Sequence, residues 1–114
     1  MNPVSQKPNR GDVFWVNLDP AIGTEVRKTR PAVIVSNNAQ NAVGQRVLAA
    51  PVTSNVRRVY SFEALIALKG KPVKAMLDQV RCLDQSRLTG YICTLTREEM
   101  QQIEKAIRIA FDLE

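Results

Sequence analysis

The sequence predicts an α+β domain: a small, highly curved antiparallel sheet or partly closed β-barrel with a C-terminal helix. Short segments of β-branched and aromatic residues alternate with turn residues along most of the chain, and one amphipathic segment of helical periodicity ends it. A chain of 114 residues is long enough to bury one core. We therefore expect a flexible arm at residues 1–9 and a single domain over residues 10–114.

The first expected strand covers residues 13–18, which are rich in β-branched and aromatic side chains and end at an Asp-Pro turn. Residues 21–29 lack periodicity and are typical of a long loop. Pro31 then restricts Arg30 to an extended conformation. The continuous apolar run at residues 32–35 fits a second strand that is buried on both faces.

Polar residues at 37–45 indicate a loop or a short helix, and the next strand is expected at residues 47–53. Pro51 predicts that this strand lies at a sheet edge or contains a bulge, because proline donates no hydrogen bond to a neighbouring strand. Another strand is expected at residues 62–68, followed by a turn at 69–72.

The alternation of apolar and polar residues predicts a further strand at residues 74–83. Successive side chains on a strand point to opposite faces, so Asp78 and Val80 would share one face and Gln79 and Arg81 the other. Either polar pair could line a groove or could simply face solvent.

The last segment predicts a helix that packs on the sheet. Thr96 and Glu99 fit a capping box, in which a hydroxyl and a carboxylate accept hydrogen bonds from free backbone N–H groups. Four apolar residues then recur at helical spacing and give the helix one apolar face. They are Met100, Ile103, Ile107 and Ala110.

The residue types present exclude several kinds of chemistry. The chain has no histidine, and Cys82 and Cys93 lack CxxC spacing, so we expect no metal site and no cofactor. Both cysteines lie in apolar surroundings and are expected to be buried and reduced. Any hydrolytic reaction must therefore use Arg, Lys, Asp, Glu, Thr, Ser or Tyr.

Hydropathy and charge bear on the compartment and the partner. No window approaches the roughly 18 apolar residues of a membrane span, and the polar start lacks the apolar core of a signal peptide. We therefore expect a cytoplasmic protein with no membrane partner. The net charge of +5 indicates an anionic partner such as nucleic acid, or only a solvated basic surface.

Two junctions between loop and strand carry candidate site residues. Arg30 lies where the long loop enters a core strand, so a rigid strand would anchor a guanidinium that can bind a phosphate through two hydrogen bonds. Alternatively, Arg30 forms a salt bridge with Glu25. Thr53, Ser54 and Asn55 end a strand, where they could orient a phosphate or a ribose hydroxyl, or act only as turn residues.

Four blocks of this sequence, in order and spacing, resemble the MazF/PemK toxin family, and the resemblance covers about residues 10–113. The blocks are RGDVFWVNLDPAIGTE at 10–25, TRPAVIVSN at 29–37, APVTS at 50–54 and LDQVRCLDQSRL at 77–88. The resemblance implies an SH3-like, partly closed antiparallel barrel with a C-terminal helix, assembled as a homodimer. It also implies the toxin of a type II toxin–antitoxin system, a sequence-specific, metal-independent endoribonuclease. Such toxins cleave single-stranded mRNA by attack of the 2′-hydroxyl, which leaves a 2′,3′-cyclic phosphate and a 5′-hydroxyl.

The resemblance assigns catalytic positions to Arg30 and Thr53. Arginine side chains stay protonated, so Arg30 is expected to stabilise the phosphate, while Thr53 holds the phosphate or the attacking hydroxyl. Glu25 and Asp78 are the candidates for proton transfer. Thr24 stands where some family members have a histidine, so a role of that histidine is not carried over to this chain.

A further set of residues is expected to bind RNA: Arg27, Lys28, Ser54, Gln79, Arg81 and Trp15. The basic side chains would contact the backbone, and Trp15 would stack on a base, which is the usual route to single-strand recognition. The alternative for Trp15 is a position in the core.

The resemblance also implies a MazE-like antitoxin, whose acidic, disordered tail could bind the basic loop at residues 27–30. Two other functions remain open. One is a gyrase-poisoning toxin of the same fold, although those toxins depend on a Trp-Gly-Ile tail and this chain ends in Phe-Asp-Leu-Glu. The other is a non-catalytic RNA-binding barrel, against which the presence of both Arg30 and Thr53 speaks.

Overall fold

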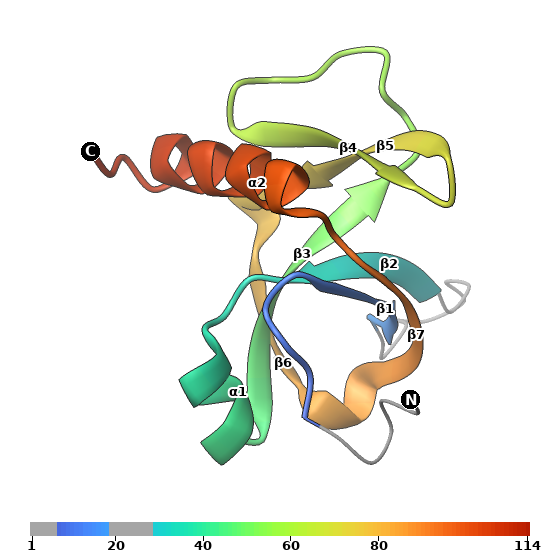
Figure 1. Ribbon diagram of the computed structural model, residues 1–114, viewed down its shortest axis with the longest axis vertical. Coiled ribbons are helices and arrows are strands. Elements are labelled where there is room, and N and C mark those ends of the chain that lie inside the picture. Colours follow the sequence, from blue (N-terminus) through green and yellow to red (C-terminus); the bar gives the residue numbers. More distant parts are fainter. Residues whose placement is uncertain (1–6, 19–28) are drawn as a thin grey trace, which may run out of the picture.

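The computed structural model describes residues 7–18 and 29–114. In this part of the chain, seven antiparallel strands form one curled sheet in the order β4-β5-β3-β2-β1-β7, and β6 pairs with β3 beside this path. Helix α2 lies beside the β4–β5 hairpin, and the shorter α1 lies near β6 (Figure 1). The predicted class, a curled antiparallel sheet with a C-terminal helix, is confirmed.

The strands are β1 (Asp12–Asn17), β2 (Thr29–Ile34), β3 (Arg46–Thr53), β4 (Glu63–Leu68), β5 (Lys71–Met76), β6 (Arg81–Asp84) and β7 (Leu88–Thr94). The helices are α1 (Asn38–Val43) and α2 (Arg97–Ala110), with two short 3-10 turns, η2 (Leu77–Gln79) and η3 (Gln85–Arg87). Among residues 7–18 and 29–114, helices with the length and apolar character needed to cross a bilayer are absent.

Two apolar cores lie on opposite faces of β1 and β2. Val13 and Val33 belong to the core that also contains residues of β4, β5 and α2. Phe14 and Ala32, their neighbours in sequence, belong to a second core with residues of β3 and β6. The prediction that the strand after Pro31 is buried on both faces is therefore confirmed.

Strand β3 lies inside the sheet, so the predicted edge position for Pro51 is wrong. On one side β3 pairs with β2, and Ala32 faces Pro51. On the other side, the pairing of β3 with β6 reaches as far as Ala49, and its pairing with β5 starts at Val52. Pro51 falls in the interval between these two partners, where the sheet requires no N–H donor from it.

The strand predicted at residues 74–83 is interrupted. Met76 and Leu77 are both buried, so the alternation ends there, and the 3-10 turn η2 separates β5 from β6. A 3-10 turn repeats every three residues rather than every two. The prediction that Asp78 shares a strand face with Val80 is therefore wrong.

The turn between β4 and β5 fixes the register of that hairpin. Lys69 and Gly70 both have positive φ, of 51° and 82°, which is the conformation of a two-residue type I′ turn. Because this turn has the twist of the flanking strands, it sets Glu63 opposite Met76 and Leu65 opposite Lys74.

Helix α2 begins at the predicted capping box. Glu99 accepts hydrogen bonds from the backbone N–H of Thr96 and of Ala67 on β4, both at 3.0 Å. Partial burial raises the pKa of Glu99. The hydrogen bonds from these N–H groups and from the Thr96 hydroxyl together lower it by more, so the pKa lies below its ordinary value. Ile103 and Ala106 are fully buried against the sheet.

The Glu99 cap predicts a pH-dependent contribution to stability. We expect Glu99→Gln to lower the free energy of unfolding at neutral pH by about 1 kcal/mol. The contribution of the carboxylate is fully present above the unfolded-state pKa of about 4.3 and is lost as the pH falls through the lower folded-state pKa. Denaturant unfolding at several pH values measures it. Glu98→Gln, in the same helical turn, is the control and should show a smaller change; equal losses would contradict the cap.

Two predicted features differ in detail from the structure or lie partly outside it. Cys82 is exposed and Cys93 is half-buried, so the expected burial of both is wrong, and burial raises the pKa of the Cys93 thiol. Of the predicted arm, residues 1–6 lie outside the described residues. Lys7 donates hydrogen bonds to the Gly44 carbonyl (3.0 Å) and to the Gln85 side chain (3.3 Å).

Candidate active site

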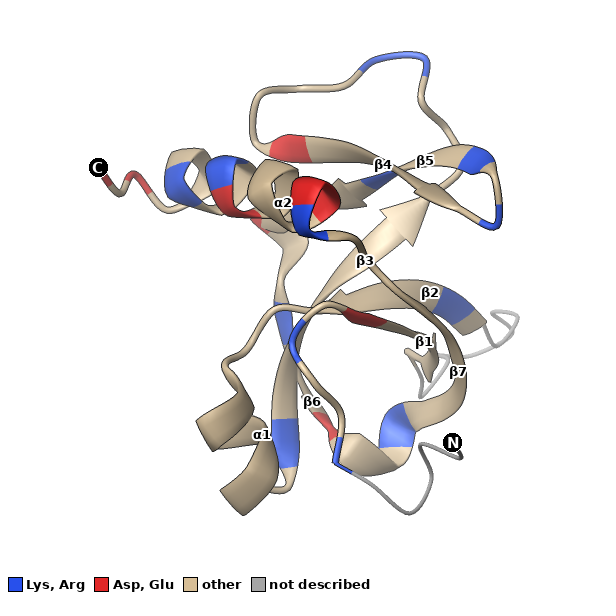
Figure 2. Ribbon diagram, viewed as in Figure 1, with Lys and Arg blue, Asp and Glu red and all other residues tan. Residues whose placement is uncertain are grey.

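A pocket of about 380 Å³ lies where β2 and β3 meet. Its walls are formed by Trp15, Arg30, Pro31, Val52, Thr53, Ser54 and Val73. Four of these are predicted site residues: three come from strands β1, β2 and β3, and Ser54 directly follows β3. Figure 2 shows basic segments at the start of β2, in the loop between β3 and β4 and at the β4–β5 turn, with acidic segments on α2.

The strand register brings Arg30 and Thr53 together. Ala32 faces Pro51 in the β2–β3 ladder, and extending this antiparallel register by two residues sets Arg30 opposite Thr53. Directly opposed residues point to the same face, with their Cα atoms about 5 Å apart. A guanidinium and a hydroxyl can therefore act on one bound group.

The Arg30 guanidinium is available to a ligand. The Arg30 side chain is half-buried. In the β1–β2 ladder, Arg30 is opposite Val16, which is fully buried. Within residues 7–18 and 29–114, the Arg30 side chain makes neither a hydrogen bond nor an ion pair that would occupy its donors. A half-buried cation with free donors is suited to bind a phosphate.

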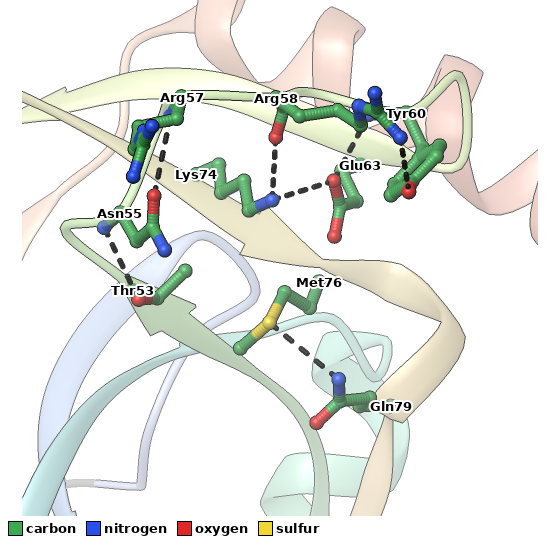
Figure 3. A network of polar contacts seen from close by, with 9 residues as sticks. All are labelled: Thr53, Asn55, Arg57, Arg58, Tyr60, Glu63, Lys74, Met76 and Gln79. Atoms are coloured by element: carbon green, nitrogen blue, oxygen red, sulfur yellow. Dashed lines mark hydrogen bonds and ion pairs between the residues drawn. The ribbon is translucent and has the colours of Figure 1, made fainter.

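The Thr53 hydroxyl retains its proton for a ligand. Its Oγ1 accepts a hydrogen bond from the backbone N–H of Asn55 at 3.2 Å, and Asn55 in turn accepts one from the N–H of Arg57 at 3.3 Å (Figure 3). An oxygen that accepts one bond can still donate its O–H. These polar residues can therefore be turn residues and site residues at once, because the turn orients the Thr53 hydroxyl.

Trp15 is 45% exposed and lines the pocket, so the alternative of a core position is wrong. It faces Pro31 in the β1–β2 ladder, and Phe14 and Val16 on the other face of β1 belong to the second core. Trp15 and Arg30 line the same pocket, and an exposed indole is suited to stack on a nucleobase.

Lys74 and Glu63 form an ion pair beside the pocket that sequence reasoning missed. Lys74 Nζ lies 2.9 Å from Glu63 Oε1 and donates a hydrogen bond to the Arg58 carbonyl at 2.6 Å, and the two side chains are only 11% and 7% exposed. Lys74 is directly opposite Thr53 in the β3–β5 ladder. The register of the β4–β5 hairpin would have indicated this ion pair, because it makes Lys74 and Glu63 diagonal neighbours of opposite charge.

Three predicted residues do not line this pocket. Asp78 and Gln79 are exposed on η2, where the Gln79 amide is 3.5 Å from the Met76 sulfur, and Arg81 is exposed on β6 opposite Ala49. Thr24, Glu25, Arg27 and Lys28 lie outside the described residues. The predicted salt bridge between Arg30 and Glu25 lies outside them as well.

A larger depression of about 510 Å³ lies beside α1. Of the described residues that line it, Asp84 and Arg46 are charged, and the Asp84 carboxylate already accepts a hydrogen bond from the N–H of Ser86. That backbone N–H is the main cause of a lowered pKa of Asp84. The described residues contain no cluster of three or more His, Cys, Asp or Glu that could hold a metal ion. We therefore place the candidate active site at Arg30 and Thr53.

Comparison with known proteins extends over nearly the whole chain. The endoribonuclease MazF9 of Mycobacterium tuberculosis is 37% identical over 113 residues, which cover 91% of this chain and 96% of MazF9. The fold resembles that of a MazE–MazF structure (Form-II) from Deinococcus radiodurans, with a TM-score of 0.81 and 28% identity over 96% of this chain and 100% of that chain. It also resembles an endoribonuclease in complex with its cognate antitoxin from a mycobacterial species, with a TM-score of 0.80 and 26% identity over 94% and 97% of the two chains.

A family model described as PemK-like, MazF-like toxin of type II toxin-antitoxin system matches residues 9–111. This match covers most of the domain, including β1, β2 and β3, which form the pocket. The chain therefore belongs to the PemK-like, MazF-like toxins of type II toxin–antitoxin systems.

Proposed function

We propose that this protein is a toxin that acts in the cytoplasm as a sequence-specific, metal-independent endoribonuclease on single-stranded RNA, including mRNA. The observation that carries the proposal is one pocket lined by Arg30, Thr53 and an exposed Trp15. The family membership and the endoribonuclease MazF9 among its relatives support the same activity.

In the proposed reaction, the ribose 2′-oxygen attacks the adjacent phosphorus. The bond from phosphorus to the 5′-oxygen breaks, the 2′-proton leaves to a base, and the 5′-oxygen takes up a proton. The products are a 2′,3′-cyclic phosphate and a 5′-hydroxyl. Extra negative charge develops on the phosphate oxygens in the transition state, and the Arg30 guanidinium is placed to stabilise it. The Thr53 hydroxyl would hold the phosphate or the attacking hydroxyl.

The proton acceptor in this scheme is Glu25 or Asp78. Asp78 is exposed on η2 and does not line the pocket of the isolated chain, so its participation would require RNA or a second subunit to bring it close. Glu25 belongs to the segment that precedes Arg30 in the sequence. A carboxylate can remove the 2′-proton if it lies within hydrogen-bond reach in the complex.

The proposed RNA-binding surface surrounds the pocket. Trp15 would stack on a base, and Ser54 would contact the sugar or the phosphate. The basic side chains of Arg27, Lys28 and Arg81 would bind the RNA backbone, with the Gln79 amide facing the substrate.

We further propose that the toxin is a homodimer and that a MazE-like antitoxin inhibits it. The support is the resemblance to the MazE–MazF structure and to the mycobacterial complex with an antitoxin. The positive net charge favours an acidic antitoxin tail, and the basic loop at residues 27–30 is the proposed place for it.

The decisive experiment incubates the protein with a long unstructured RNA in EDTA and maps the ends of the fragments. We expect cuts at a short, repeated sequence, with 2′,3′-cyclic phosphate and 5′-hydroxyl ends. A matched RNA with a single 2′-deoxy nucleotide before the cut should resist cleavage there, because it lacks the attacking oxygen. Binding without cleavage by a folded protein would instead support the non-catalytic RNA-binding barrel.

A further inference from the structure

The loop between β3 and β4, residues 54–62, begins at the pocket and carries side chains that the proposed reaction leaves unused. It starts directly after Thr53 and contains two arginines and two aromatic residues: Arg57, Arg58, Tyr60 and Phe62. Figure 1 shows the loop extending outward beyond the β4–β5 hairpin. Its start beside the catalytic pocket and its basic, aromatic composition make it a candidate for binding the RNA next to the cut.

The stacked rings of Tyr60 and Phe62 form an aromatic surface. Their rings are nearly parallel, at 4°, with centroids 5.2 Å apart, and Tyr60 is 46% exposed. Neither ring belongs to the two apolar cores. An exposed aromatic ring of this kind can stack on any nucleobase.

The ion pair between Lys74 and Glu63 holds this surface in place. The Glu63 carboxylate accepts a hydrogen bond from the Tyr60 N–H at 2.9 Å, and Lys74 donates to the Arg58 carbonyl at 2.6 Å (Figure 3). The loop is thus fixed on both sides of residue 59. A surface ordered before binding loses less conformational entropy when RNA binds.

The same contacts place the surface near the catalytic pocket. Lys74 is directly opposite Thr53 in the β3–β5 ladder, so their side chains share one face. Lys74 Nζ also lies 6.0 Å from the centre of the Tyr60 ring. One lysine therefore separates the catalytic hydroxyl from the aromatic surface.

Positive charge surrounds the ring. The Arg58 guanidinium donates a hydrogen bond to the Tyr60 hydroxyl at 3.1 Å, and its carbon lies 5.6 Å from the ring centre. The guanidinium therefore lies over the ring, and its hydrogen bond to the hydroxyl orients the ring. A cation beside an exposed ring is suited to a base and the phosphate attached to it.

We propose that Tyr60, backed by Phe62 and oriented by Arg58, is a stacking platform for the nucleotide beside the cleaved phosphate and contributes to sequence preference there. This inference rests on the proposed ribonuclease function. The stacked ring pair favours RNA over an acidic peptide, since a peptide would need the arginines but not the parallel rings.

The test compares Tyr60→Leu, Tyr60→Phe and a control, Phe111→Leu, on a library of RNAs randomised around the cut. Phe111 is a similarly exposed aromatic, 55% exposed, that follows α2. We expect Tyr60→Leu to raise KM by about 5- to 150-fold with a smaller change in kcat, and to reduce the base preference at one position beside the cut. Tyr60→Phe should keep most of the affinity, and Phe111→Leu should match the wild type.

The outcomes separate this inference from the proposed function. If the wild type does not cleave RNA, the ribonuclease proposal fails, and filter binding of a 2′-deoxy RNA by the same variants still tests the platform. If the wild type cleaves and Tyr60→Leu keeps both KM and base preference, the platform is wrong. Loss of binding to an acidic antitoxin peptide, with RNA binding unchanged, would also overturn it in favour of a peptide surface.

A second measurement needs no variant. RNA that carries 5-bromouridine beside the cut is irradiated with the wild-type protein, and the crosslinked peptide is identified by mass spectrometry. We expect the crosslink in the peptide that contains Tyr60. A crosslink that is confined to other parts of the chain would contradict the platform even if Tyr60→Leu proved unstable.

Discussion

Replacement of Arg30 by alanine is expected to lower kcat for RNA cleavage by about 10²- to 10³-fold, with little change in the stability of the fold. The rate falls because the guanidinium is the charged donor that the pocket offers to the transition-state phosphate. Stability changes little because Arg30 is half-buried and its removal leaves no described partner unpaired. Single-turnover cleavage with saturating protein measures the chemical step directly.

Conservative substitutions at the same pocket refine this expectation. Arg30→Lys keeps the charge but loses the planar fork, so its rate should lie between those of the wild type and Arg30→Ala. Arg46→Ala, an exposed arginine on β3 that lines the other depression, is the matched control and should cleave like the wild type. Equal rates for Arg30→Ala and the wild type would remove Arg30 from the catalytic step.

Removal of one partner of the Lys74–Glu63 pair is the second large expected effect. Glu63→Ala would leave the nearly buried Lys74 ammonium without a described anionic partner, with the Arg58 carbonyl and the Tyr60 ring as its remaining described contacts. Breaking a buried pair in this way costs about 3 to 5 kcal/mol, and the remaining carbonyl favours the lower end of that range. Urea unfolding followed by circular dichroism measures the loss in the free energy of unfolding.

A double-mutant cycle separates the pair from its surroundings. We expect the combined variant Glu63→Ala with Lys74→Met to be more stable than Glu63→Ala alone, because no unpaired charge remains buried. Glu104→Ala is the control, since it breaks the Arg10–Glu104 pair, whose side chains are 30% and 45% exposed, and should cost less than about 1 kcal/mol. Additive losses in the cycle would mean that the pair is not coupled.

Local sequence patterns predict much of this fold. The strand before the Asp-Pro turn and the capping box at Thr96 were predicted, because each depends on neighbouring residues. The short helix at residues 38–43 is one of the two alternatives, loop or short helix, that were predicted for residues 37–45. Arg30 and Thr53 were found in the same way, from the points where a loop meets a strand.

The elements that were missed depend on distant parts of the chain. Strand β7 was not predicted, because none of its residues is fully buried and its alternation is weak, and its pairing with β1 is what makes it a strand. The break at η2 occurs because the fold buries Leu77 directly after Met76. The Lys74–Glu63 pair likewise becomes visible only when the β4–β5 register is known.

The single tryptophan of this protein gives the pocket an optical signal of its own. Trp15 is the only indole in the sequence, and it is half exposed in the wall that Arg30 and Thr53 share. Its emission therefore comes entirely from the pocket, without background from the cores. A nucleobase that stacks on an indole quenches its fluorescence, so the occupancy of the site can be followed in unlabelled protein and in real time.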